Sequence, residues 1–107
     1  MKLRLHPEAH AEFDQATDYY AGIYPSLGVD FVAKIDAALD SIREAPERWP
    51  LWPGLPANAP VIRRMLVKRF PYGVAYEVFD EQIVILAICA LRRKPLYWLE
   101  RNADAVE

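Results

Sequence analysis

The chain has 107 residues, of which 53% are hydrophobic and 26% are charged, and it contains a single cysteine. This composition excludes an intrinsically disordered chain, and the lone cysteine excludes an intramolecular disulfide. The length predicts a single domain over residues 1–107. Because no secretory signal and no membrane-spanning run is visible, we expect a cytoplasmic protein without a membrane partner.

The net charge of −2 conceals an uneven distribution of charge along the chain. Acidic residues outnumber basic ones before Pro60, and basic residues outnumber acidic ones from Pro60 to Arg101. The small net charge argues against a protein that simply coats nucleic acid, whereas the basic second half favours an anionic target or partner. Chance segregation of solvated charges is the alternative interpretation.

The first half of the chain predicts one strand and two helices. Residues 2–6 alternate in polarity, which indicates a short strand, and Pro7 suits the first turn of a helix. Apolar residues at helical spacing then predict two amphipathic helices, which end near Gly22 and before Pro46 and form a helical hairpin. The two apolar stripes are Ala9, Phe13, Ala16, Tyr20 and Ile23, and Phe31, Ile35, Ala38, Leu39 and Ile42.

The second half predicts a loop followed by strands. Residues 46–60 contain five prolines together with Trp49 and Trp52, and the need to pack two indoles predicts an ordered loop. Strands are expected over residues 61–67, 74–79 and 83–90, and the last is apolar enough to be covered on both faces. Pro95 is expected to begin a short C-terminal helix.

The predicted element order is therefore β-α-α-β-β-β-α, which is an α+β fold. The three successive strands indicate an antiparallel sheet. We expect the helical hairpin to cover one face of this sheet and the other face to stay partly free.

The first candidate site is a group of cations on the predicted strand over residues 61–67 and just after it. Alternation places Arg64 and Lys68 on one face and Arg63 on the other, and Arg69 follows. Cations at this spacing can hold phosphates or carboxylates. The alternative is that the charges protect an exposed strand from pairing with another chain.

The second candidate site follows the last strand. Arg92, Arg93 and Lys94 are adjacent, and Tyr97 and Trp98 come soon after. Neighbouring cations can lower the pKa of a phenol toward that of a general base, arginine can stabilise charge on a phosphate, and an aromatic ring can stack on a base. The alternative is that Trp98 anchors the C-terminal segment while the cations are solvated.

Other reactive residue types carry little signal. His6 and His10 are four residues apart without a third ligand, so no metal site is expected. Cys89 lies within an apolar run, which is typical of a core residue. No glycine-rich phosphate loop is present, and we expect no cofactor.

Taken in order, these features resemble the ParE branch of the RelE/ParE toxins. The resemblance extends over nearly the whole chain, and its separate pieces are loose but together fairly specific. The residues that carry it are Ala9, Glu12, Ala16, Tyr19-Tyr20, Leu27-Gly28, Phe31, Ile42, Pro46, Arg63-Arg64, Phe70-Pro71-Tyr72, Val74, Tyr76, Ile85-Leu86-Ala87, Arg92-Arg93, Pro95, Tyr97-Trp98 and Arg101.

The resemblance implies the toxin of a type II toxin–antitoxin system, with roles in growth inhibition and plasmid stabilization. A cognate antitoxin would neutralise it in a hetero-oligomer. ParE-like toxins inhibit DNA gyrase, whereas RelE-like toxins cut mRNA on the ribosome through attack of the 2′-hydroxyl on the adjacent phosphate. In a RelE-like protein Arg93 and Tyr97 would be catalytic. The target-binding residues would be Arg63, Arg64, Lys68, Arg69, Arg92, Lys94 and Trp98.

The details favour a gyrase inhibitor over a nuclease. Two segments resemble ParE-like rather than RelE-like members, namely Phe70-Pro71-Tyr72 and Pro95-Leu96-Tyr97-Trp98. The small net charge favours the same branch, because a protein that binds the ribosome is expected to be strongly basic. Many members carry a histidine just before the paired arginines, where this chain has Ala90-Leu91. That departure removes an acid–base group and leaves open a third possibility, a non-toxic module that binds an antitoxin.

Overall fold

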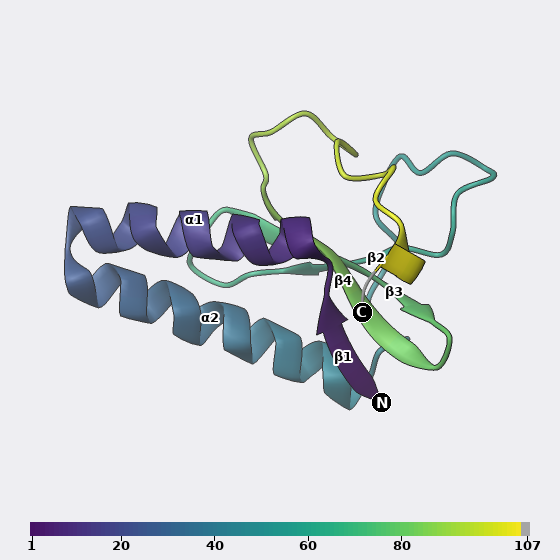
Figure 1. Cartoon of the computed structure of the whole chain (residues 1–107), viewed down its shortest axis with the longest axis horizontal. Helices are drawn as coiled ribbons and strands as arrows, with labels where there is room; N and C mark the ends of the chain where they lie inside the picture. The colour runs from purple at the N-terminus through teal and green to yellow at the C-terminus, as the bar shows by residue number, and fades with distance from the viewer. Residues whose placement is uncertain (106–107) are drawn as a thin grey trace.

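The computed structural model describes residues 1–105 and consists of two long helices packed on a four-stranded sheet (Figure 1). This α+β arrangement confirms the predicted fold class. The elements in chain order are β1 (Lys2–Leu5), α1 (Pro7–Ile23), α2 (Pro25–Glu44), β2 (Arg63–Leu66), β3 (Tyr72–Phe79), β4 (Gln82–Ala90) and the short 3-10 helix η1 (Ala103–Ala105).

The sheet has the strand order β1-β4-β3-β2, with β4 and β3 in the centre. Strands β2, β3 and β4 form the expected antiparallel meander, but β1 pairs with β4 in parallel, so the sheet is mixed rather than antiparallel. The physical reason is that α1 and α2 separate β1 from the later strands, and such a long connection allows parallel pairing. Asp80 and Glu81 form the β3–β4 turn with φ of 52° and 60°, as two-residue hairpin turns require.

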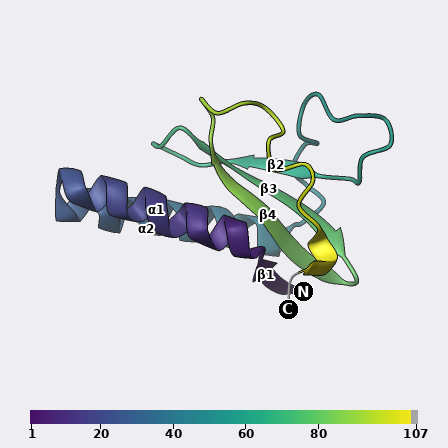
Figure 2. The ribbon, with the colours of Figure 1, turned by 45° about the horizontal axis from the view of Figure 1, so that its top comes forward.

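The helical hairpin covers one face of the sheet, as expected, and the apolar stripes of the two helices pack against it there, except that Ile23 at the end of α1 is 51% exposed. Phe31, Ile35 and Ile42 are at most 1% exposed, and they pack with Val74 and Tyr76 of β3. The two helices approach closely at Gly28, where a Cβ would lie 2.7 Å from the Cβ of Ala21. Figure 2 shows the hairpin extending beyond the end of the sheet.

The opposite face of the sheet is also covered, contrary to the expectation that it stays partly free. The loop over residues 46–60 and the chain after β4 fold onto it, and Trp52 and Trp98 pack edge to face with ring centroids 5.0 Å apart. The loop itself is held along the edge of the sheet by backbone hydrogen bonds, from the Arg64 N–H to the Pro50 carbonyl at 2.8 Å and from the Trp52 N–H to the Ile62 carbonyl at 2.9 Å. The start of the loop is fixed from the helix side, where the Tyr76 hydroxyl donates to the Pro46 carbonyl at 2.6 Å and Arg63 donates to the Trp49 carbonyl at 2.7 Å. The sheet therefore lies between two cores.

The chain after β4 corrects the prediction of a helix beginning at Pro95. Residues 95–100 form consecutive turns, and the only helical element that follows among residues 1–105 is η1. Leu96 has φ of 62°, a left-handed conformation that is incompatible with a right-handed helix. Along this path Trp98 enters the core and Arg101 reaches Glu12 of α1. No helix among residues 1–105 is both long and apolar enough to cross a membrane.

Candidate functional site

The site is organised around the unpaired part of β4. Strand β1 pairs with β4 only along Gln82–Ile85, so the next residues of β4 have no neighbouring strand on that side. Leu86 is the extra residue of a β-bulge, because Ala75 pairs with Ala87 and Tyr76 pairs with Ile85. The edge of the central strand beyond Ile85 must therefore find hydrogen-bond partners outside the sheet.

Glu12 of α1 and Arg101 provide those partners. Glu12 Oε1 accepts from the Ile88 N–H at 3.0 Å and from Arg101 Nη1 at 2.8 Å. Arg101 Nη1 also donates to the Leu86 carbonyl at 3.0 Å, and Nη2 donates to Glu12 Oε2 at 3.2 Å. Both side chains are only 11% exposed. Burial is the largest single influence on Arg101 and lowers its pKa, but the hydrogen bond to Glu12 and the negative charges of Glu12 and Glu8 together outweigh it, so the net shift is upward. Arg101 therefore carries its positive charge at neutral pH.

Tyr97 is held by the same carboxylate. Its hydroxyl donates a short hydrogen bond to Glu12 Oε2, and Arg93 lies 3.8 Å above the centre of the phenol ring. Burial, followed by the contact with Glu12, raises the pKa of Tyr97, and the opposing influence of Arg93 is smaller. This direction is opposite to the lowered pKa expected from the neighbouring cations. At neutral pH Tyr97 is therefore a protonated donor, not a general base.

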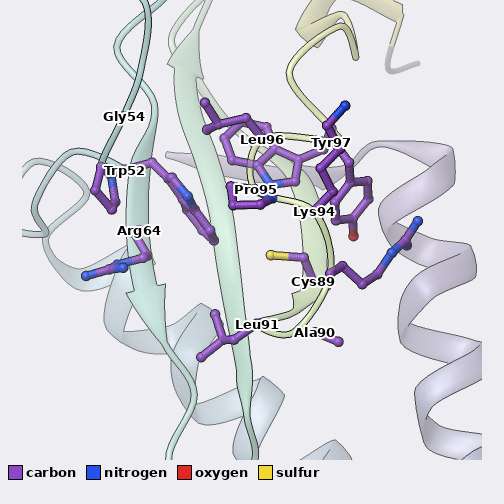
Figure 3. A pocket seen from close by; sticks show the side chains of 13 residues that line it. Trp52, Gly54, Arg64, Cys89, Ala90, Leu91, Lys94, Pro95, Leu96 and Tyr97 are labelled. Atoms are coloured by element: carbon purple, nitrogen blue, oxygen red, sulfur yellow. The ribbon is translucent and has the colours of Figure 1, made fainter.

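A cavity of about 470 Å³ opens beside Tyr97, between the end of β4 and the loop over residues 46–60. We call it the cationic pocket, because Arg64, Arg93 and Lys94 contribute to its lining and no acidic residue among residues 1–105 does. Figure 3 shows Trp52, Leu91 and Leu96 around it. The complete lining is Trp52, Pro53, Gly54, Arg64, Cys89, Ala90, Leu91, Arg93, Lys94, Pro95, Leu96, Tyr97 and Trp98.

The cationic pocket combines a largely apolar lining with one buried donor that lacks an acceptor. Arg64 lies over the indole of Trp52 at 5.8 Å from the ring centre, and its buried Nε has no hydrogen-bond partner among the described residues. Cys89, predicted to be a core residue, is 3% exposed, and burial raises its pKa to about 11. The Cys89 thiol is therefore protonated at neutral pH, where it is a poor nucleophile.

The predicted site residues gather only in part. Arg64, Arg93, Lys94 and Tyr97 line one cavity although they come from two distant segments, and Arg92 lies in the adjoining groove beside α1. The alternation predicted for β2 is confirmed, since Arg64 and Arg63 face opposite sides of the sheet.

The remaining candidates lie elsewhere. Strand β2 ends at Leu66, so Lys68 falls beyond it and does not line the pocket. Arg69 pairs with Asp30 of α2 at 2.7 Å, and Arg63 is bound to the loop carbonyl described above. Trp98 is 1% exposed, so the expectation that it contacts a target does not fit its place in the core. It anchors the C-terminal segment, as the alternative interpretation had it.

Glu12 is the residue that sequence reasoning missed as part of the site. In the sequence Glu12 stands out only as one of the residues that carry the family resemblance, and its partners Tyr97 and Arg101 lie 85 and 89 residues away. The available signal is its position beside the apolar stripe, next to Phe13 and one turn before Ala16. Within residues 1–105, no three His, Cys, Asp or Glu side chains gather as a metal site would require.

Comparisons with known proteins agree with this architecture. Residues 3–95 match the family described as the ParE toxin of the type II toxin–antitoxin system parDE. A solved structure of the chromosomal ParDE toxin–antitoxin system from P. aeruginosa is similar, with a TM-score of 0.71 and 22% identity over 86% of this chain and 97% of that chain. No curated protein matches the sequence. Because the family match covers most of the chain, this protein belongs to the ParE toxin family of type II toxin–antitoxin systems.

Proposed function

We propose that the protein inhibits DNA gyrase by binding it, without catalysing a reaction. The observation that carries this proposal is the state of Tyr97. Its hydroxyl donates to Glu12, its pKa is raised, and Arg93 covers its ring. A ribosome-dependent nuclease of the RelE kind needs side chains that exchange protons near neutral pH, and the candidate phenol does not fit that need.

The cations around the pocket support a binding role. Arg92, Arg93 and Lys94 are exposed on the segment that follows β4, and Arg64 joins Arg93 and Lys94 in the pocket lining. A cluster of exposed cations accelerates encounter with an anionic surface. Family membership supports an antitoxin as the second partner, because the family is one of toxin–antitoxin systems.

The test is a supercoiling assay with purified gyrase and relaxed plasmid, run beside a ribosome-dependent mRNA cleavage assay. We expect supercoiling to fall with added protein and the mRNA to stay intact. Tyr97→Phe should keep the inhibition, whereas joint replacement of Arg92 and Lys94 by glutamine should weaken it by at least about tenfold through lost charge pairs.

Arg43→Gln is the matched control, because Arg43 is an exposed cation on α2 that pairs with Asp40 and does not line the cationic pocket. It should inhibit like the parent protein. If folded protein in micromolar excess leaves supercoiling unchanged, gyrase is not the target. Cleavage of mRNA that depends on Tyr97 would instead support the nuclease.

A further inference from the structure

The cationic pocket has the chemistry of a site for protein rather than for DNA. Gyrase acts on DNA, so cations on an inhibitor can contact either DNA phosphates or carboxylates of the enzyme. We propose that the pocket binds a peptide segment of the target, with one aliphatic side chain in the cavity and a flanking carboxylate on Arg64 or Lys94. This inference rests on the proposed function, because it takes the pocket to be the surface that contacts the target.

The first argument is that the aromatic rings of the pocket are already covered. Proteins that bind single-stranded DNA stack bases on open aromatic faces. Trp52 is 8% exposed, carries Arg64 on its ring and packs against Trp98. The ring centre of Tyr97 lies 3.8 Å from the Arg93 guanidinium and 5.3 Å from that of Arg101. Neither ring offers a free face to a base.

The second argument concerns what remains open. The other large apolar side chains of the lining are aliphatic, and Leu91 is 45% exposed beside Pro53 and Leu96. A volume of about 470 Å³ is in the range of cavities that enclose small ligands, and it is ample for one aliphatic side chain. Burying such a side chain is favourable, whereas a nucleotide phosphate gains nothing from an apolar surface.

The third argument is the charge of the pocket. The Nε of Arg64 is buried without an acceptor, and Lys94 is an exposed cation in a lining that has no carboxylate. A buried donor without a partner is costly, and a carboxylate is the acceptor that arginine binds best in a protein partner. The overall charge of −2 also disfavours a DNA polyanion, whereas one acidic segment needs only these local cations.

The test uses a fluorescein-labelled peptide of alternating leucine and glutamate and measures fluorescence polarisation with the full chain. We expect binding, together with a shift of the Trp52 indole signal in NMR spectra. A peptide with serine in place of leucine should bind at least about tenfold more weakly, and so should one with lysine in place of glutamate. A single-stranded thymidine oligonucleotide should not displace the bound peptide.

Variants locate the site. Arg64→Met keeps an unbranched side chain but removes the guanidinium that lies over Trp52. Lys94→Met likewise removes the charge of an exposed residue of the lining. Each should weaken the leucine–glutamate peptide several-fold, Leu91→Ser should do so through the apolar contact, and Arg43→Met should not. If Arg64→Met fails to fold, as judged by circular dichroism, Lys94→Met and Leu91→Ser still test the site.

The proposal is overturned if the oligonucleotide displaces the peptide, if the serine peptide binds equally well, or if the pocket variants bind like the parent. Its failure is distinguishable from that of gyrase inhibition. Peptide binding without any effect on supercoiling would keep this proposal and remove gyrase as the target. If the protein inhibits gyrase but does not bind the peptide, gyrase inhibition stands and the peptide site is overturned.

Discussion

Glu12 and Arg101 form a buried ion pair, with Glu12 Oε1 and Arg101 Nη1 separated by 2.8 Å across 89 residues of sequence. The pair satisfies backbone groups of β4 that a neighbouring strand would otherwise bind, since the carboxylate accepts from the Ile88 N–H and the guanidinium donates to the Leu86 carbonyl. It also orients Tyr97 through the second carboxylate oxygen. One pair thus connects α1, β4 and the C-terminal segment.

Glu12→Ala should therefore destabilise the fold by about 3 kcal/mol, because it leaves the Arg101 charge buried without its partner. Urea denaturation followed by circular dichroism measures the change. Glu8→Ala is the control, since Glu8 also reaches Arg101 at 3.5 Å but its side chain is 65% exposed. That variant should differ from the parent by less than about 1 kcal/mol. Equal effects of the two variants would contradict the role given to Glu12.

The close approach of the helices at Gly28 gives a second prediction. A methyl group there would lie 2.7 Å from the Cβ of Ala21 and 3.0 Å from its Cα. Gly28→Ala should therefore cost about 1–3 kcal/mol through overpacking, in spite of the higher helix propensity of alanine. Gly22→Ala is the matched variant in α1, where nothing lies within 4 Å, and it should not destabilise the protein. The melting temperatures of both variants test this prediction. A higher melting temperature for Gly28→Ala than for the parent protein would contradict it, because it would mean that the helices can move apart without cost.

The buried tyrosines predict how stability changes at alkaline pH. Burial raises the pKa of Tyr72 and of Tyr76 to about 12, and Tyr97 shifts in the same direction. Tyrosine in an unfolded chain titrates near pH 10. Because the folded pKa is the higher one, the stabilising contribution of these groups is complete below about pH 10 and is lost as the pH rises toward the folded values.

The measurement is the urea midpoint as a function of pH, together with phenolate absorbance. Stability should be nearly constant from pH 8 to about 10 with respect to these groups and should fall above it. Tyr97→Phe should make that fall shallower, since one of the three contributions is removed. A decline of unchanged steepness in this variant would show that Tyr97 titrates normally.

Pulse labelling after induction in a bacterial host tests the proposed target in cells. If the protein inhibits gyrase, incorporation of thymidine should fall before that of methionine. The opposite order would identify translation as the target. Co-expression of a cognate antitoxin should abolish either effect, and Arg43→Gln should behave like the parent, since Arg43 lies outside the proposed binding surface.

Much of the fold could be predicted because its signals are local. Helical periodicity identified α1 and α2, and a continuous apolar run identified β4 as a strand covered on both faces. Alternation along β2 also placed Arg64 and Arg63 on opposite faces correctly. These patterns depend on neighbouring residues only, so one sequence is enough to detect them.

The C-terminal segment and the site depend on contacts between distant residues. Pro95 is a genuine local signal for a helix start, but the packing of Trp98 and the reach of Arg101 to Glu12 favour a chain of turns with Leu96 at positive φ. The direction of the Tyr97 pKa shift likewise depends on a contact between residues that are far apart in the sequence. The nearby cations are visible in the sequence, whereas the carboxylate that outweighs them comes from α1.

The short reach of β1 has a consequence for solubility. A central strand with bare N–H and C=O groups is a template on which a second chain can add, and this is how many β-proteins begin to aggregate. Here side chains block the unpaired edge of β4, because the Ile88 N–H is hydrogen-bonded to Glu12 and the Leu86 carbonyl to Arg101. Removing Glu12 would therefore do more than loosen one molecule, since it would also expose a place where the next copy can attach.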